Sequence, residues 1–504
     1  MKNTPISYST RLTVVVLVLS VMVLVACSPF RPSLRHSPEG DMPRAYSVTP
    51  DGATRSWQWW KDFDDPELDV LINEALSGNF TLGEAWARLT QVRATAVQAG
   101  AELYPQLSLS ADGSVSSERS DSGAGGDTHT VKSYSLGLAS SYEVDLWGKI
   151  RAGQEAALLE ASAAREDVNA AAMSVAAEVA ERWINIIALR MQKALLETQL
   201  ETSLTYLELT ELRYRKSLVS ALDVYQQRQV VEKVKAEIPL VEAEEQVLMH
   251  ELAVLLGKQP RACMNITRKT LPLVGKPPAL GVPADLLSAR PDVRAAFLLL
   301  QSADWQVSAA RADRLPNISV SASALYGAGE LELIFDNWIL NLAAHLTAPL
   351  WDGKRRAAEV DRTRAVADEK LIAYRETVYT AVKEVENALV NEDRQRRHIG
   401  FVEEQIGAAR RALEEARLQY VKGVNDYLPV LTQLNAAQDL EIGLIDKRSA
   451  LLIDRITLYR ALGGTWVDAL EPGADAHSVD MPHDTKEGSQ NDGRGHNKYN
   501  SSER

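Results

Sequence analysis

Residues that could carry chemistry are few and scattered in this chain of 504 residues. Eight histidines are present, but there is no HExxH pattern for a zinc protease, no GxSxG turn for a serine nucleophile and no glycine loop for phosphate. Two cysteines cannot build a disulfide framework or a cysteine-rich zinc domain. The eight methionines form no cluster that would indicate a copper path. We therefore expect neither an enzyme nor a protein with a cofactor or a resident metal.

Cys27 is the residue whose surroundings predict a covalent modification. A basic segment precedes an apolar run at residues 12–25, which is short for a membrane span but typical of a signal-peptide core. The run ends in Leu24-Val25-Ala26-Cys27, which resembles a bacterial lipobox, where cleavage before the cysteine leads to its acylation. We expect residues 1–26 to be a signal peptide and Cys27 to carry lipid. The alternative is an uncleaved anchor, or an ordinary signal peptide with an incidental cysteine.

Cleavage before Cys27 changes the charge and the thiol count. It removes two cations and no acid, so the net charge goes from −13 to −15. It leaves Cys263 as a single free thiol in a predicted loop, so no disulfide can form within the chain. The acidity argues against a nucleic-acid partner, because phosphate binding requires clustered cations.

Ser28 after the cysteine, rather than an aspartate, favours sorting to the outer membrane by analogy with known lipoproteins.

The sequence contains an internal repeat, so its predicted helices and strands occur twice. Each match between the copies is short, but the matches share one order and a nearly constant spacing, which is too long for a solenoid. The sequence therefore predicts two copies of one large unit. The matching strings are Leu103-Tyr104-Pro105-Gln106 with Leu315-Pro316-Asn317, Leu146-Trp147-Gly148-Lys149 with Leu350-Trp351-Asp352-Gly353-Lys354, and Arg213-Tyr214-Arg215-Lys216-Ser217 with Gln419-Tyr420-Val421-Lys422-Gly423.

Each copy is predicted to contain a helix, two strands, a long helix, a turn and a returning helix. Strong helix formers dominate the long segments, and apolar residues recur there every three or four positions. Pro239 should kink the returning helix of the first copy. The expected helices are 66–102, 151–213 and 221–256 in the first copy, and 290–313, 355–420 and a final helix to Leu462 in the second.

Four segments alternate between apolar and polar residues. Their polar positions are mainly serine, asparagine and acids, with His345 among them. Such alternation, with aromatic residues near the ends, is typical of transmembrane β-strands that face lipid on one side and water on the other. A soluble sheet covered by helices on one face is the alternative. The segments are 107–116, 133–146, 318–326 and 338–350, and the Ser- and Gly-rich residues 117–130 predict an external loop.

The number of strands constrains the assembly. Four strands cannot close a barrel, and an open sheet edge is not tolerated in hydrocarbon. If these strands span a membrane, several copies of the chain must therefore share one barrel. Helices that are apolar on more than one face point the same way, because they need neighbours on both sides.

Further strings in a fixed order carry a family resemblance. They include Trp59-Trp60-Lys61-Asp62-Phe63 and Leu458-Tyr459-Arg460-Ala461-Leu462-Gly463-Gly464, and the set covers residues 27–467. With them the chain resembles the outer-membrane factors of tripartite efflux and secretion systems, in particular the TolC-like, NodT-type lipoprotein channels that work with RND pumps. The remaining strings are residues 65–68, 141–151, 252–257, 283–287, 290–294, 348–353 and 384–389.

The resemblance implies a mainly α fold with a membrane β part: a homotrimer with an α-barrel and a shared 12-stranded transmembrane β-barrel. It implies a lipid-anchored, outer-membrane exit duct that extends into the periplasm, driven by an inner-membrane RND pump through a periplasmic adaptor. The alternatives are a TolC-type duct for type I protein secretion and a non-channel periplasmic lipoprotein. The predicted divisions are signal peptide 1–26, lipidated segment and first equatorial helix 27–104, strands 105–148, helices 149–260, linker and equatorial helix 261–314, strands 315–352, helices 353–466 and disordered tail 467–504.

The resemblance also implies where gating occurs. It places the turns at 216–224 and 422–430 at the periplasmic tip, where such channels close. Asp223 and Asp426 are candidate gate acids, because three copies of an acid in a narrow ring favour cations; an ordinary helix cap is the alternative. Tyr420 and Tyr427 are candidate constrictions, with a packed aromatic as the alternative.

The same turns are where such channels meet their adaptor. The resemblance makes Lys216, Ser217, Lys422 and Gly423 candidate adaptor contacts, with a solvated turn as the alternative. The exported solute and the particular pump and adaptor are not encoded in any of these patterns, since the pump selects the cargo.

Overall fold

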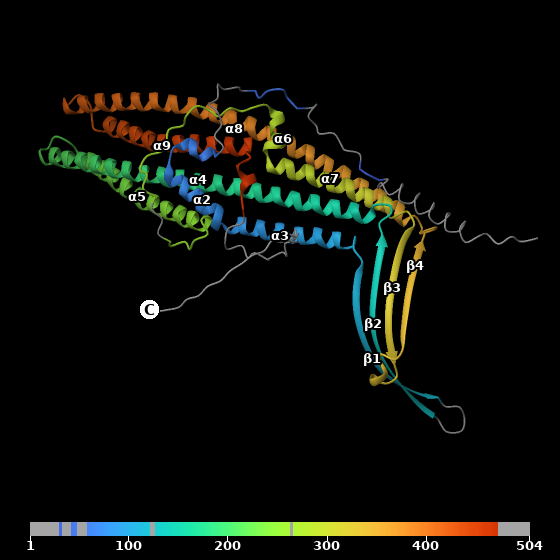
Figure 1. Ribbon diagram of the computed structural model, residues 1–504. Coiled ribbons are helices and arrows are strands. Elements are labelled where there is room, and N and C mark those ends of the chain that lie inside the picture. The colour runs from blue at the N-terminus through green and yellow to red at the C-terminus, as the bar shows by residue number, and fades with distance from the viewer. Residues whose placement is uncertain (1–29, 33–41, 48–57, 121–126, 263–265, 472–504) are drawn as a thin grey trace, which may run out of the picture.

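The computed structural model describes residues 30–32, 42–47, 58–120, 127–262 and 266–471. Long helices run side by side to form an elongated body, and four strands project together from one end of it (Figure 1). The strands and the reversing turns of the long helices therefore lie at opposite ends of the molecule. No helix among the described residues is both long and apolar enough to cross a membrane.

The internal duplication is confirmed by the lengths of the helices. In each copy a helix of 22 residues precedes two strands, a helix of 67 residues follows them, and a helix of 35 residues returns. The first copy has α3 Phe80–Ala101, α4 Lys149–Arg215 and α5 Ala221–Leu255, and the second has α7 Pro291–Ala312, α8 Arg355–Val421 and α9 Leu428–Leu462. Short elements complete the chain: η2 Trp59–Phe63, α2 Pro66–Gly78, η3 Pro283–Asp285, α6 Leu286–Ala289, η4 Leu331–Leu333 and η5 Trp466–Ala469.

The predicted single helix over 66–102 is two helices, α2 and α3, which separate at Asn79. Asn79 has an extended backbone, with φ −67° and ψ 130°. Its side-chain oxygen accepts a hydrogen bond from the Leu82 amide at 3.0 Å, and its side-chain nitrogen donates to the Leu255 carbonyl at 2.8 Å. Asparagine competes in this way with helical backbone bonding, so the residue caps α3 and ends α2.

Pro239 lies inside α5, and the kink expected there stays a prediction. The helix includes the proline and continues to Leu255. The start of α5 is the one predicted from the turn at 216–220, because Ser220 caps it. The cap at the start of α2 is also as predicted, since the Asp65 carboxylate accepts from the amides of Glu67 and Leu68.

The strands form one antiparallel sheet in the order β1-β2-β3-β4. β1 Gln106–Ser120 and β2 Asp127–Val144 extend into most of the predicted loop at 117–130. β2 ends two residues before Leu146, and β4 Trp338–Thr347 ends before Pro349, which has no amide hydrogen for the ladder. The remaining strand, β3, spans Asn317–Ala328. Within the described part of the chain, β1 and β4 each pair with one strand, so each leaves one edge open.

The register confirms that the two faces of the sheet differ. Residues directly opposite each other in adjacent antiparallel strands share a face. One apolar row crosses all four strands through Leu109, Leu138, Ala324 and Leu340. The neighbouring polar row is Ser108, Ala139, Ser323 and Asn341. Leu109 and Leu340 are 71% and 68% exposed, so the apolar face is not covered by helices of its own chain.

The aromatic core lies in the body of the molecule, between the short helices η2 and η5 and the long helix α9. Trp59 stacks on Tyr459 at a centroid distance of 5.5 Å, and Trp60 meets Trp466 edge-on at 4.8 Å. Val467 is fully buried beside them, so η5 belongs to the packed body, although residue 467 was expected to begin the tail. Residues 472–504 of the expected tail lie outside the described part of the chain.

Candidate functional site

The two helix turns lie at the end of the body that is farthest from the strands (Figure 1). After α4, the Leu218 amide donates to the Arg213 carbonyl at 2.9 Å; after α8, the Val424 amide donates to the Gln419 carbonyl at 3.0 Å. Both are Schellman-type helix ends, which need a left-handed residue after the helix. Gly423 supplies it with φ 73°, and Ser217 supplies it with φ 59°. The helices α4 and α8 therefore end with the same backbone geometry, whereas α9 begins one residue later in its turn than α5 does.

The four residues predicted to contact an adaptor are exposed at this tip: Lys216, Ser217, Lys422 and Gly423. Exposed apolar side chains, which sequence reasoning did not single out, surround them. An apolar surface beside cations at the end of an elongated body is typical of a protein contact. These apolar residues are Leu218, Leu222, Tyr225, Val424 and Leu428.

Tyr420 and Tyr427 are buried in the structure and join the two copies. Their rings are 5.2 Å apart, and the Arg213 guanidinium lies 4.3 Å from the centre of the Tyr420 ring. The Tyr427 hydroxyl donates to the side-chain oxygen of Gln227, which is fully buried. Burial raises the pKa of both phenols, so both stay protonated at neutral pH. The two rings thus hold the α4–α5 and α8–α9 hairpins against each other and are not presented to solvent.

The two candidate acids have different surroundings. The Asp223 carboxylate accepts the Ser220 amide at 3.0 Å, while the Ser220 hydroxyl accepts the Asp223 amide at 3.3 Å. Asp223 is therefore part of a capping box, which is the alternative that the sequence left open. Asp426 is exposed, and among the described residues its carboxylate has no hydrogen bond or ion pair.

Pro429 explains why Asp426 does not cap its helix. With the spacing of 206 between the copies, Asp426 matches Ser220, and Pro429 matches Asp223. In the first turn the cap side chain accepts the amide of Asp223. Proline has no amide hydrogen, so the matching donor is missing in the second turn. The Asp426 carboxylate is therefore left exposed to solvent.

The polar face of the sheet carries a second group of candidates. Glu143 pairs with Ser319, and Ser319 pairs with His345, so these three residues share one row of that face. This places His345 on the face that the sequence assigned to water. A metal-binding group of three or more His, Cys, Asp or Glu residues does not occur within the described ranges. Cys27 and Cys263 both lie outside those ranges.

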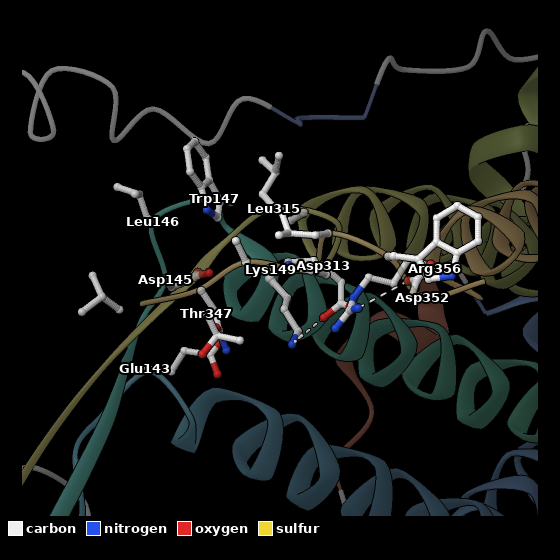
Figure 2. Close-up of a pocket in the computed structure, with 17 residues that line it drawn as sticks. Glu143, Asp145, Leu146, Trp147, Lys149, Asp313, Leu315, Thr347, Asp352 and Arg356 are labelled. Carbon is white, nitrogen blue, oxygen red and sulfur yellow. Dashed lines mark hydrogen bonds and ion pairs between the residues drawn. The ribbon is translucent and has the colours of Figure 1, made fainter. Parts of the chain in front are cut away.

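A cavity of about 550 Å³ lies where the strands meet the helices (Figure 2). Lys149 Nζ is 2.9 Å from Asp313 Oδ1, and Arg356 Nε donates to Asp313 Oδ2 at 3.0 Å. Burial acts to raise the pKa of the Asp313 carboxyl, but the two cations outweigh it, so this pKa lies below its ordinary value. Sequence reasoning missed this group, because its members are far apart in the chain and each resembles an ordinary surface charge.

Comparison with known proteins gives consistent matches. Residues 71–258 and 282–464 match the family described as "Outer membrane efflux protein". The chain is 36% identical to the pyoverdine export outer membrane protein OpmQ of Pseudomonas aeruginosa over 81% of this chain and 87% of that protein. It is 26% identical to nodulation protein T of Rhizobium leguminosarum bv. trifolii over 78% of this chain and 85% of that protein.

A solved structure matches the fold of the whole body. The outer-membrane channel OprN superimposes with a TM-score of 0.78 at 26% identity, over 87% of this chain and all of that chain. The two segments matched by the family each contain one copy of the duplicated unit.

The hydrogen bond of Tyr427 gives a test of how the tip is held. Tyr427→Phe leaves the buried oxygen of Gln227 without its donor, which should reduce local stability by about 1–3 kcal/mol. Amide hydrogens in the first turns of α9 should then exchange about fivefold faster or more, as measured by hydrogen–deuterium exchange. Tyr420→Phe is the matched control, because the buried Tyr420 hydroxyl has no hydrogen-bond partner among the described residues. Equal exchange in the two variants would contradict the assignment.

Proposed function

Since the chain belongs to the outer membrane efflux protein family, we propose that it forms the passive exit duct of a tripartite efflux system. It is an outer-membrane channel protein of the TolC-like type, and OpmQ and OprN are an export protein and a channel rather than enzymes. The observation that carries the proposal is the sheet with one exposed apolar face, joined to helices of 67 residues. At about 1.5 Å per residue such helices reach roughly 100 Å from the sheet.

Three copies of the chain supply the closed barrel of this duct. The open edges of β1 and β4 cannot remain unpaired in hydrocarbon, and a twelve-stranded barrel pairs all of them. The polar faces of the sheets then line a water-filled passage, and the apolar faces meet lipid. Cys27, acylated after removal of residues 1–26, adds a lipid anchor at the outer membrane.

The duct does not move its cargo by itself. An inner-membrane RND pump supplies the energy, and a periplasmic adaptor connects the pump to the tip. The cargo is a small organic solute, such as a drug or another toxic compound, and pyoverdine export by OpmQ is in keeping with this class. The efflux relatives favour this reading over protein secretion, and the exposed apolar sheet favours it over a non-channel periplasmic lipoprotein.

Asp426 is the gate acid that the geometry favours over Asp223. Its carboxylate is free, whereas that of Asp223 is held in the capping box. Three copies of Asp426 around a narrow tip attract cations and repel anions. Tyr420 and Tyr427 contribute indirectly, because they hold the two turns in register.

Bilayer recordings of the purified trimer test the duct and its gate together. The wild-type protein should conduct ions, and Asp426→Ala should lower the preference for cations, because the ring of carboxylates is removed; this is measured as a smaller reversal potential in a KCl gradient. Asp223→Ala is the control, because its carboxylate serves the helix cap, so the cation preference should stay as in wild type. A wild-type protein that passes no current would refute the duct, and unchanged currents in Asp426→Ala would refute the gate.

The lipid anchor is tested by metabolic labelling. Wild-type protein expressed with labelled palmitate should carry the label, and Cys27→Ser should lose it. Cys263→Ser should keep the label, since its thiol is not at the cleavage site. Cys27→Ser should still form trimers, because the strands and not the lipid join the copies. Label retained in Cys27→Ser would disprove the assignment.

The adaptor contact is tested with a photo-crosslinking residue at Lys422. In cells that express the efflux system, the crosslinked product should contain the periplasmic adaptor, identified by mass spectrometry. The control position is Val131, which is 59% exposed at the opposite end of the molecule and should capture no adaptor. An adaptor captured equally from both positions, or from neither, would argue against docking at the tip.

A further inference from the structure

The junction of strands and helices is held by two contacts between the copies of the duplicated unit. The Trp147 indole donates to the Pro316 carbonyl at 2.7 Å, and Lys149 Nζ lies 2.9 Å from Asp313 Oδ1. Figure 2 shows Trp147, Lys149 and Asp313 around the cavity at this junction. We call these four residues the closed elbow. Trp147 and Lys149 come from the first copy, and Asp313 and Pro316 come from the second.

Every member of the closed elbow has a counterpart in the other copy. Trp147 and Lys149 correspond to Trp351 and Lys354 through the shared Leu-Trp string, and Pro316 corresponds to Pro105. Asp313 corresponds to Glu102, which is likewise an acid three residues before the proline. Glu102 and Asp313 both end their 22-residue helices, with nearly equal backbone angles of −67°, −14° and −62°, −13°. We call Glu102, Pro105, Trp351 and Lys354 the open elbow.

The open elbow is not closed within one chain. Trp351 is 90% exposed and the preceding Leu350 is 94% exposed, although large apolar side chains are usually covered. Glu102 and Lys354 are also exposed, and neither has an ion pair among the described residues. The four residues lie at the outer elements of the sheet, since Pro105 precedes β1 and Trp351 follows β4. They therefore flank the two edges that lack a neighbour.

We propose that the open elbow closes between neighbouring copies of the chain. The indole of Trp351 donates to the carbonyl of Pro105 of the partner subunit, and Lys354 pairs with Glu102 of the partner subunit. This inference rests on the proposed function, which requires the copies to join edge to edge. It identifies the residues that hold neighbouring copies together and the register in which their strands pair. The charges are complementary in the same order as in the closed elbow, an acid on the 22-residue helix and a lysine after the tryptophan.

The same correspondence sets the pairing of β4 with β1 of the partner subunit. Within the chain, Tyr142 lies opposite Val320. Trp147 and Trp351 are 204 residues apart, so the counterpart of Tyr142 on β4 is Leu346. Pro105 and Pro316 are 211 residues apart, so the counterpart of Val320 on β1 is Leu109. Leu346 should therefore lie opposite Leu109 of the partner subunit. Both residues are on the apolar face, so this register keeps the two faces continuous around the barrel.

The helices extend the joint in the same manner. α4 packs along α7 within the chain. By the same correspondence α8 packs along α3 of the partner subunit. Exposed apolar residues on α3 and α8 are available for this contact: Phe80, Val97, Ile372 and Tyr379. A tryptophan at a membrane surface also serves as a lipid anchor, but that role requires neither the acid at 102 nor the lysine at 354.

Charge exchange tests the ion pair. Lys354→Glu should lower the ratio of trimer to monomer by about tenfold or more on mild-detergent gels, because each joint then holds two facing acids. Glu102→Lys should act in the same direction. The double variant Glu102→Lys with Lys354→Glu should restore the trimer, since the pair is re-formed with its charges reversed. If Trp351 only anchors lipid, Lys354→Glu should leave the trimers unaffected, and that result would overturn the ion pair. A double variant that does not recover the trimer would overturn it as well.

Disulfide trapping tests the register separately. The register places Asn341 opposite Ser114 of the partner subunit, where facing Cβ atoms come to about 4.5 Å of each other, within reach of a disulfide. In a Cys263→Ser background, Asn341→Cys with Ser114→Cys should give covalently linked copies on non-reducing gels. Asn341→Cys with Ser110→Cys, displaced by four residues, is the matched control and should not.

The outcomes distinguish this inference from the proposed function. Linked copies from the displaced pair, or trimers without linkage from the predicted pair, would overturn the register and leave the duct intact. A wild-type chain that stays monomeric in the same gels would overturn both the joint and the duct.

Discussion

The requirement that every backbone amide and carbonyl in hydrocarbon find a partner governs this molecule. β2 and β3 satisfy it within the chain, because each has a neighbour on both sides. β1 and β4 do not, since each pairs along one side only. The exposed apolar face makes the problem unavoidable, because Leu109 and Leu340 belong in lipid rather than in water. Association of copies is therefore a consequence of the strand ladder and does not depend on any special adhesive surface.

The internal duplication explains how the open strand edges can be paired, and a comparison of the two copies shows where they differ. A joint that works once within the chain, between β2 and β3, can be used again between chains, because the second copy repeats the first. The tips show how far the copies have diverged. Ser220 caps α5, whereas the matching Asp426 cannot cap α9 because Pro429 lacks the amide hydrogen. Two differences between the copies, Ser220 against Asp426 and Asp223 against Pro429, therefore replace a capping hydroxyl with a free carboxylate.

The sequence predicted what depends on local periodicity and missed what depends on distant contacts. The strands and the long helices followed from alternation and composition, and the start of α5 followed from its turn. The break at Asn79 was missed, because it depends on a hydrogen bond to the Leu255 carbonyl. For Asp223 the sequence could not separate gate from cap, since both uses require an acid near a helix start. Burial of Tyr420 and Tyr427 depends on the opposite hairpin, which no local pattern reveals.

The elbow and the tip are coupled by the helices that connect them. α4 begins at Lys149 and ends at the turn with Ser217, and α8 begins after Lys354 and ends at the turn with Gly423. Over a helix of roughly 100 Å, a rotation of one degree at the start moves the end by about 2 Å. A defined position of the turns at the tip therefore depends on an elbow held by directed contacts rather than by apolar packing alone. The hydrogen bond of Trp147 and the ion pair of Lys149 are contacts of that kind. Apolar contacts with lipid have no fixed direction, so they would not prevent the helices from tilting.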